Sequence, residues 1–228
     1  MQGNSLIVGV GIPTLEMWVP EFGLSLTAMG CYFGMKRFDG YREQTMKLFT
    51  AKGSMLSESR ESLVLSALKA NCKYLLMVDT DMKFPRELLH QWVKIMDRGE
   101  VKILSANCTT KAIPAEVTAT GFQNERIFTD EDSHGIQEVE SVGCAVTLID
   151  VKIFQKIPRP WFNQEWQPEL QHFCGEDRYF MRKARAHGFK NYIDHDISKQ
   201  VSHYGSFAYN HDVVGEIKET EDGESKVA

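Results

Sequence analysis

Two aspartates stand one residue apart directly after a run of apolar residues. Asp79, Thr80 and Asp81 follow residues 74–78, a continuous hydrophobic stretch typical of a buried parallel strand. Open α/β sheets bind ligands at the carboxyl ends of such strands, so both carboxylates are expected at that edge. Crowded carboxylates repel unless a cation neutralises them, and Mg²⁺ or Mn²⁺ prefers oxygen ligands, phosphate oxygens included. The pattern indicates a metal that bridges aspartate to a diphosphate; the competing interpretation is a loop that caps the helix expected from Pro85.

A second acidic pair, Glu176 and Asp177, follows Gly175 at the start of a helix expected over 179–187. Negative charge is favourable there because of the helix dipole, so capping explains the pair on its own. The functional interpretation makes Asp177 a general base, because an acceptor hydroxyl is a poor nucleophile until a carboxylate takes its proton. Glu176 is the second candidate for that role.

His203 and Arg60 are the remaining candidates. His203 lies in the segment 201–205, past the expected strands, and a neutral imidazole there completes a metal site. A purely structural histidine is the alternative, and three others compete for the role: His172, His187 and His195. Arg60 is expected on a helix surface or in contact with phosphate.

The segment 158–166 combines two prolines with two tryptophans and a phenylalanine. Proline fixes the backbone and removes hydrogen-bond donors, so a regular helix is excluded there. Aromatic rings on such a loop suit the apolar face of an acceptor sugar, and core packing explains them equally well.

Strands and helices alternate through the first half of the chain. The hydrophobic patterns predict strands at 6–10, 45–49, 73–78 and 101–106, and helices at 22–35, 56–70 and 85–98. This alternation predicts an α/β fold with a mostly parallel central sheet flanked by helices. The second half is expected to be more antiparallel, with strands at 116–120, 125–128, 139–149 and 191–193 and the helix at 179–187.

Length and composition are those of a folded, mildly acidic protein. The 228 residues fit one domain, predicted over 1–214, followed by an acidic, mobile tail over 215–228. The net charge of −5 gives no general attraction to polyanions. Five widely spaced cysteines favour a reducing, cytoplasmic setting, and the absence of a signal peptide or spanning segment predicts no integral membrane association.

The order of the segments resembles the GT-A class of glycosyltransferases, in particular the family-two-like group of nucleotide-sugar transferases. The resemblance runs from about residue 6 to 209. It rests on these motifs in order: Gly11-Ile12-Pro13-Thr14, Ser59-Arg60, the D-x-D within 74–82, Val142-Gly143-Cys144-Ala145-Val146, Gly175-Glu176-Asp177 and Val201-Ser202-His203-Tyr204-Gly205.

On the donor side, the resemblance implies that Pro13 and Thr14 line the nucleotide pocket, and Thr80, between the two aspartates, is expected in the same donor site. It also implies that Arg60 approaches the nucleotide or its phosphates. The sequence departs from many relatives at the next position, where Glu61 replaces an asparagine. That departure bears directly on the role of Arg60.

On the reaction side, the resemblance implies that Asp79 holds the ribose or reaches the metal through water. Asp81 and His203 would bind Mn²⁺ or Mg²⁺, which offsets charge on the departing diphosphate. Asp177 would deprotonate the acceptor hydroxyl, with direct displacement and inversion at the anomeric carbon. Related enzymes that retain configuration share a similar metal triad, so both stereochemical outcomes stay open.

The predicted activity is a metal-dependent glycosyltransferase, either a hexosyl- or a pentosyltransferase, that uses a nucleotide diphosphate sugar, UDP-sugar favoured. The acceptor is a glycan, a protein or a small molecule, or, in a viral variant, a hydroxymethylated pyrimidine in DNA. Small enzymes of this kind occur in bacteria and bacteriophages, which predicts a bacterial or phage-infected host cytoplasm. Two other classes stay open: a nucleotidyltransferase and a non-catalytic nucleotide-sugar binding protein.

Overall fold

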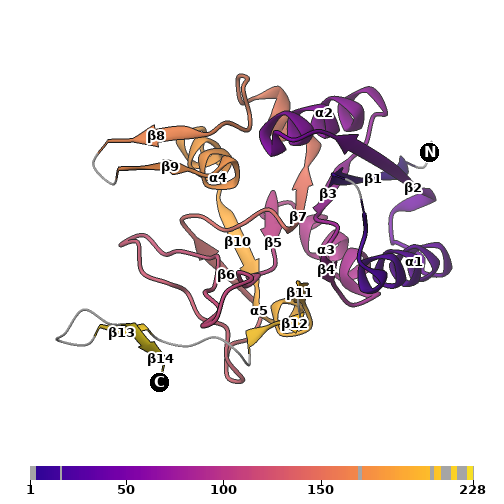
Figure 1. The fold of residues 1–228 in the computed structure, drawn as a ribbon. Helices are drawn as coiled ribbons and strands as arrows, with labels where there is room; N and C mark the ends of the chain where they lie inside the picture. The colour runs from indigo at the N-terminus through magenta and orange to yellow at the C-terminus, as the bar shows by residue number, and fades with distance from the viewer. Residues whose placement is uncertain are drawn as a thin grey trace.

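A seven-stranded sheet runs through the centre of the molecule (Figure 1). The computed structural model describes residues 4–15, 17–168, 171–205, 208–211, 217–219 and 225–227. In spatial order the strands are β2 (Tyr41–Lys52), β1 (Asn4–Thr14), β3 (Tyr74–Val78), β7 (Val146–Asp150), β5 (Ile103–Ser105), β10 (Asn191–Asp194) and β6 (Ile136–Val139). Only β7 and β6 run against the other five, so the expectation of a mostly parallel sheet with an antiparallel second half is confirmed.

One face of this sheet is covered by three helices: α1 (Pro20–Met35), α3 (Leu88–Met96) and the short α5 (His195–Ser198). In α3 five of the six apolar residues lie on one face at spacings of three or four positions and are buried against the sheet, while Ile95 is half-buried. Trp92 is fully buried, and its indole nitrogen donates to Asp194 at the end of β10 (2.8 Å). Buried residues of α1, α3, β1 and β3 form one continuous apolar core.

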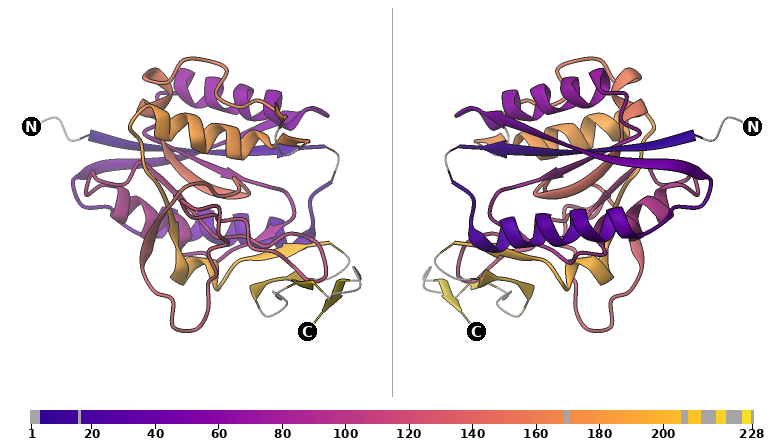
Figure 2. Two further views of the ribbon diagram at one scale, coloured as in Figure 1. Left: turned by 90° about the vertical axis from the view of Figure 1, so that its left-hand side faces the viewer. Right: turned by 90° about the vertical axis from the view of Figure 1, so that its right-hand side faces the viewer.

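The opposite face carries α2 (Leu56–Lys69), the 3₁₀ helix η1 (Val151–Gln155) and α4 (Glu176–Ala186). Alternate residues of the central strands face the two helical layers, as Leu75 and Met77 of β3 do on this side and Leu76 does on the other. Figure 2 shows the sheet between its two helical layers. The result is a three-layer α/β/α arrangement.

Small sheets surround the central one. A three-stranded sheet joins β12 (Ala208–Tyr209), β11 (Ser202–Tyr204) and β4 (Met82–Lys83). A hairpin pairs β8 (Glu165–Gln167) with β9 (His172–Cys174) just before α4. These strands were absent from the sequence prediction, which ended the sheet at 191–193, because two- and three-residue strands leave no periodicity to detect.

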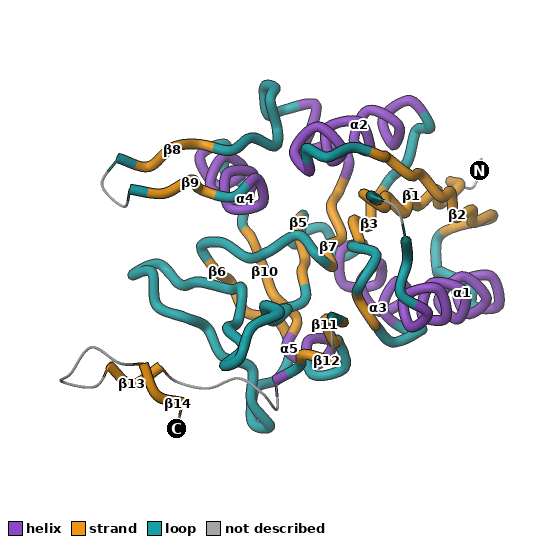
Figure 3. Tube along the Cα trace, viewed as in Figure 1, coloured by secondary structure: helices purple, strands orange, loops and turns teal. Residues whose placement is uncertain are grey.

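Two of the expected strands in the second half are wrong. Residues 106–135 form a long loop (Figure 3), in which 116–120 and 125–128 make only isolated bridges such as Thr120 with Arg126. These segments were expected as exposed strands joined by a turn, but Val117 and Ala119 are buried and no adjacent strand continues the pairing.

The single long strand expected over 139–149 is also wrong. The chain forms β6 at one edge of the sheet and β7 in the middle, with β10 and β5 lying between them. One continuous strand cannot occupy both places. The connecting segment 140–145 runs from the amino end of β10, next to Asn191, to the carboxyl end of β3, next to Val78. Its apolar residues Val142 and Cys144 are buried, which is why the sequence reads as unbroken.

The C-terminal residues are described only in part. Strands β13 (Ile217–Glu219) and β14 (Ser225–Val227) pair antiparallel. The rest of the predicted mobile tail over 215–228 lies outside the described residues, so the tail and the domain boundary at 214 stay predictions. Within the described ranges, no helix combines the length and the apolar character needed to cross a membrane.

Candidate functional site

A cavity of about 720 Å³ opens where β1, β2 and β3 end. Five of the residues predicted for the donor site line it: Pro13, Thr14, Asp79, Thr80 and Asp81. Of the other lining residues, only Ser59 belongs to a motif that the sequence analysis singled out. These residues follow β1, lie at or just after the end of β2, or begin α2: Leu15, Met17, Lys52, Gly53, Ser54, Leu56 and Ser59. The site is thus at the strand edge that the topology of an α/β sheet predicts.

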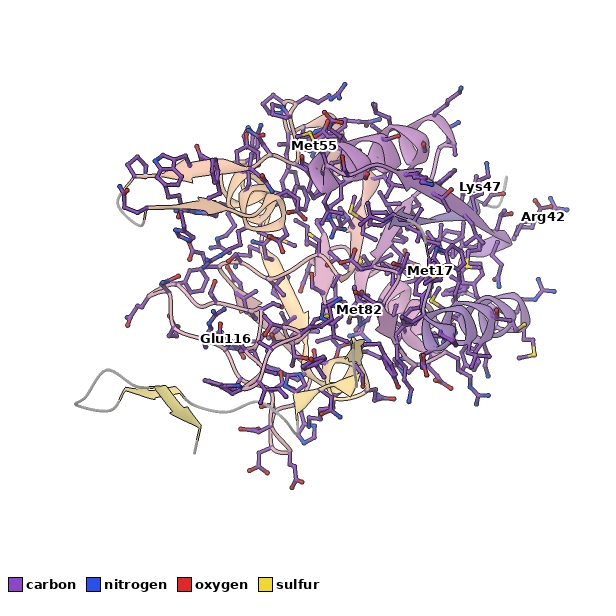
Figure 4. The ribbon with its side chains drawn as sticks, in the orientation of Figure 1. Met17, Arg42, Lys47, Met55, Met82 and Glu116 are labelled. Carbon is purple, nitrogen blue, oxygen red and sulfur yellow. The ribbon has the colours of Figure 1, made fainter. Side chains whose placement is uncertain are left out.

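Backbone hydrogen bonds fix the segment that carries the two aspartates. The amide of Asp79 donates to the Ala145 carbonyl (2.9 Å), and the carbonyls of Thr80 and Asp81 accept from the amides of Val19 (3.1 Å) and Tyr204 (2.7 Å). The segment is therefore tied to three stretches that are distant in sequence. Met82, the next residue, lies near the middle of the view in Figure 4, whereas Arg42 of β2 lies at the margin.

Arg60 is buried behind this cavity, with 2 % of its surface exposed, and it does not line the cavity. The expectation of a helix-surface residue is therefore wrong. Its Nη2 contacts Asp79 Oδ1 (3.1 Å) and its Nε contacts Glu176 Oε1 (3.1 Å). Its Nη1 donates to the Cys144 carbonyl (3.5 Å). One guanidinium thus joins the D-x-D segment, the first turn of α4 and the loop between β6 and β7.

The charges in this network shift one another. Burial alone would lower the pKa of Arg60, but the carboxylates of Asp79 and Glu176 outweigh burial and raise that pKa above its usual value. Burial raises the pKa of Glu176, and the nearby charge of Asp177 adds to the effect against the opposing influence of Arg60. Glu176 is thus a buried partner of Arg60, and Asp177 is the more accessible of the two acidic residues.

His203 faces Asp81 across the end of the three-stranded sheet. Its Nδ1 lies 2.8 Å from the Thr109 carbonyl oxygen, which only accepts, so Nδ1 carries a proton. Its Nε2 lies 3.3 Å from Asp81 Oδ1. If Nδ1 carries the only ring proton, the lone pair of His203 Nε2 faces a lone pair of Asp81 Oδ1. The contact is therefore favourable only with a proton on Nε2 or with a cation that both Nε2 and Oδ1 contact.

This donor set fits a divalent ion. Metal-bound histidines usually donate their other ring N–H to a carbonyl or carboxylate, as His203 does to Thr109. Within the described residues no group of three or more histidine, cysteine or acidic side chains surrounds one point, so the chain offers two ligands, Asp81 and His203. Mg²⁺ is commonly held by one or two protein ligands together with substrate phosphates and water.

Lys111 is a further residue near the site that sequence reasoning missed. Its Nζ lies 2.5 Å from Asp81 Oδ2, on the carboxylate oxygen that does not face His203. Burial would raise the pKa of Asp81, but the hydrogen bonds and charges of His203 and Lys111 hold that pKa at about 2. A single lysine in a loop gives no periodic or motif signal, so only the fold brings it to the site.

Asp177 lies at the start of α4, outside the residues that line the cavity. Its Oδ1 accepts from the amide of Arg178 in the first helical turn (2.7 Å), whereas the N-cap residue of α4 is Gly175, which makes no side-chain cap. Its Oδ2 lies close to Gly143, because a Cβ on that glycine would be 3.4 Å away. The second acidic motif and the glycine-containing loop therefore meet.

The departure at Glu61 has a structural explanation. Its carboxylate accepts from Arg159 Nε (2.8 Å) and from the amides of Trp161 and Phe162. Glu61 thus anchors the proline-rich segment to α2. Trp161 and Phe162 are buried, so core packing is the correct interpretation for these two rings, whereas Trp166 remains 45 % exposed.

The competing histidines lie away from the aspartates. His195 is buried and contacts Thr129 Oγ1 and Gln137 Oε1 (2.9 Å each), so it is a satisfied core histidine. His172 and His187 are exposed, on β9 and at the end of α4. Of the four candidates, His203 alone is paired with Asp79 or Asp81 among the described contacts.

Solved structures give the comparison with known proteins. A197 from STIV superposes with a TM-score of 0.60 at 17 % identity, over 93 % of this chain and 98 % of A197. The chain has the GT-A fold. A second match is S. aureus TarS 1-349 in complex with UDP, at a TM-score of 0.46 and 15 % identity, over 83 % of this chain and 57 % of that one. No protein-family model and no curated protein sequence matches the chain.

Proposed function

We propose that the chain is a metal-dependent glycosyltransferase that moves a sugar from a nucleotide diphosphate sugar to an acceptor hydroxyl. The observation that carries the proposal is the placement of Asp81, with His203 facing it at 3.3 Å, on the wall of a 720 Å³ cavity at the end of β3. GT-A sheets of this kind offer their strand ends as the ligand site. A donor fits this cavity in size, since pockets for small ligands span roughly 300 to 1,000 Å³.

Different residues at this site would bind different parts of the donor. Pro13, Thr14, Leu15 and Met17 give the cavity apolar walls suited to a nucleoside, and UDP is the nucleotide that we propose first. Asp81 and His203 would hold Mn²⁺ or Mg²⁺, which when bound would neutralise charge on the diphosphate as it leaves. Asp79, held by Arg60, would bind the ribose or contact the metal through water.

The transfer step needs a base for the acceptor. Asp177 would take the proton of the acceptor hydroxyl. The hydroxyl oxygen would bond to the anomeric carbon of the sugar while the bond from that carbon to the diphosphate oxygen breaks. Glu176 is less suited, because it is buried and paired with Arg60. A single displacement inverts the anomeric configuration. The sugar, hexose or pentose, is set by contacts beyond these residues, and we place the reaction in a bacterial or phage-infected host cytoplasm.

A panel of nucleotide sugars tested by thermal unfolding, with and without Mn²⁺, examines this proposal. A ligand at about 100 times its Kd stabilises the folded state by about 2.7 kcal/mol, which for a chain of this size raises Tm by roughly 5 to 10 °C. We expect such a shift for one donor class and only with metal.

The matched variants are Asp81→Asn and Asp132→Asn. Both neutralise one carboxylate, but Asp132 is exposed on the 106–135 loop, away from the cavity. The metal-dependent shift should vanish in the first and persist in the second. No shift with any donor in the unaltered protein would count against the proposed activity as a whole.

A further inference from the structure

Lys111 forms an ion pair with Asp81, the carboxylate that would bind the proposed metal. Its ammonium contacts Asp81 Oδ2 at 2.5 Å, while Asp81 Oδ1 faces His203. The two side chains of the ion pair are 41 % and 25 % exposed, so the contact is open to solvent and to ligands. A divalent ion and this ammonium would compete for one anionic group.

The backbone that presents Lys111 is fixed. The amide of Thr110 donates to the Glu116 carbonyl (2.8 Å), and the amide of Glu116 donates to Thr110 Oγ1 (3.0 Å). Thr109, two residues before Lys111, accepts from His203. The lysine and the histidine therefore approach Asp81 from segments that are bonded to each other.

The side chain, in contrast, is 41 % exposed. Its stem passes close to Gly205, where a Cβ would lie 3.1 Å from Lys111 Cδ, so the glycine lets the stem reach Asp81 without a clash. A lysine ammonium is a compact charge on a flexible four-carbon stem that readily changes partner. It can therefore leave Asp81 without rearrangement of the backbone, provided that another anion is offered.

A donor diphosphate is such an anion. The ion that Asp81 and His203 would hold repels an ammonium on the same carboxylate, whereas the phosphate oxygens next to that ion attract it. We propose that Lys111 is a diphosphate-binding residue: it neutralises Asp81 in the free protein and transfers to the donor diphosphate when donor and ion bind. Binding of the ion is then coupled to binding of the donor. This inference rests on the proposed function.

Two titrations by calorimetry test the inference, each on the unaltered protein, on Lys111→Met and on Lys83→Met. Lys83 is exposed on β4, two residues from Asp81, and its replacement removes the same charge without touching the ion pair. The first titration adds Mn²⁺ to the nucleotide-free protein. The second adds inorganic pyrophosphate in the presence of a chelator.

Opposite effects are expected in the two titrations. Lys111→Met should bind Mn²⁺ about tenfold more tightly, because the competing ammonium is gone, and pyrophosphate about tenfold more weakly, a coupling within the usual range for linked sites. Lys83→Met should change neither affinity by more than about twofold. A circular dichroism melt confirms that each variant is folded.

A change in only one affinity, or in neither, overturns the inference even if Mn²⁺ and UDP together bind the unaltered protein. Failure of the unaltered protein to bind Mn²⁺ with UDP or any other nucleotide diphosphate overturns the proposed function as well. The two failures are therefore distinguishable. Equal effects of Lys111→Met and Lys83→Met would likewise overturn the inference, since they would assign the result to net charge alone.

Discussion

Arg60 couples the two acidic motifs at the level of single residues. Its guanidinium contacts Asp79 and Glu176 at 3.1 Å each, so the donor-side aspartate and the start of α4 share one cation. A fork of fixed geometry is suited to this task, because each N–H direction is set by the planar group. We therefore assign Arg60 the role of a positioning residue.

Replacing Arg60 with methionine is expected to destabilise the fold strongly. The change leaves the buried Glu176 without its cation, and breaking a buried ion pair from one side costs about 3 to 5 kcal/mol. Calorimetry should show a fall in Tm of roughly 6 to 20 °C for a chain of this length. Arg60→Lys, which keeps the charge but loses the fork, should fall in between. A loss of less than about 2 °C in Arg60→Met would show that the network is dispensable.

Replacing Asp177 with asparagine separates an enzyme from a binding protein. The amide cannot take the acceptor proton, so turnover should fall by about 10² or more, while calorimetry should show donor binding within about twofold of the unaltered value. Release of nucleotide diphosphate measures turnover. Asp132→Asn serves as the control. Turnover equal to that of the unaltered protein would remove Asp177 from the mechanism.

At the scale of elements, the loop between β6 and β7 presses against α4. Gly143 has no side chain where a Cβ would lie 3.3 Å from Thr118 and 3.4 Å from Asp177 Oδ2. The spacing to Thr118 is tight, so a side chain on Gly143 must displace Thr118 or the loop by a few tenths of an ångström, while it would be just in van der Waals contact with Asp177. The loop thereby limits where the Asp177 carboxylate can lie.

Gly143→Ala should therefore lower activity more than stability. A loop shift of a few tenths of an ångström would move the contact with Asp177, the proposed base, and is expected to reduce turnover roughly tenfold, since misplacement by about 1 Å costs about 10²-fold. Tm should change by only a few degrees. Gly34→Ala in α1, where a Cβ meets nothing within 4 Å, is the control and should leave turnover unchanged. A large loss of Tm with unaltered turnover per folded molecule would contradict this view.

Sequence periodicity predicted the elements that bury a full apolar face. The helix predicted over 85–98 corresponds to α3, and the strand predicted over 73–78 corresponds to β3. Both were detectable because the buried residues form an apolar helix face in α3 and a continuous apolar run in β3. Periodicity failed where long-range pairing decides, as in the split of 139–149 between the edge and the centre of the sheet. In the site, motifs predicted Asp79 and Asp81 on the cavity wall, whereas the burial of Arg60 and the position of Lys111 depend on contacts between distant segments.

At the scale of the whole molecule, net charge bears on the acceptor. The chain carries 26 basic and 31 acidic residues, a formal net charge of −5, which offers no general attraction to a polyanion. A glycan, protein or small-molecule hydroxyl is therefore favoured over a base in DNA.

Salt dependence of turnover tests this preference. With an acceptor that is not a nucleic acid, raising the salt concentration from about 50 to about 200 mM should change kcat/KM for the acceptor by less than about tenfold. An enzyme that binds DNA through several phosphate contacts would lose about 10³-fold or more in affinity over the same range. A loss of the larger size with a modified-DNA acceptor would instead favour the alternative function, glycosylation of hydroxymethylated pyrimidines in viral DNA.

Crystals of the protein grown with UDP and Mn²⁺, measured at the manganese absorption edge, examine the central claim most directly. We expect one anomalous peak about 2.0 to 2.2 Å from both an Asp81 oxygen and His203 Nε2, with diphosphate oxygens completing its shell. Manganese bound elsewhere, with residues 79 and 81 turned away from the nucleotide, would contradict it.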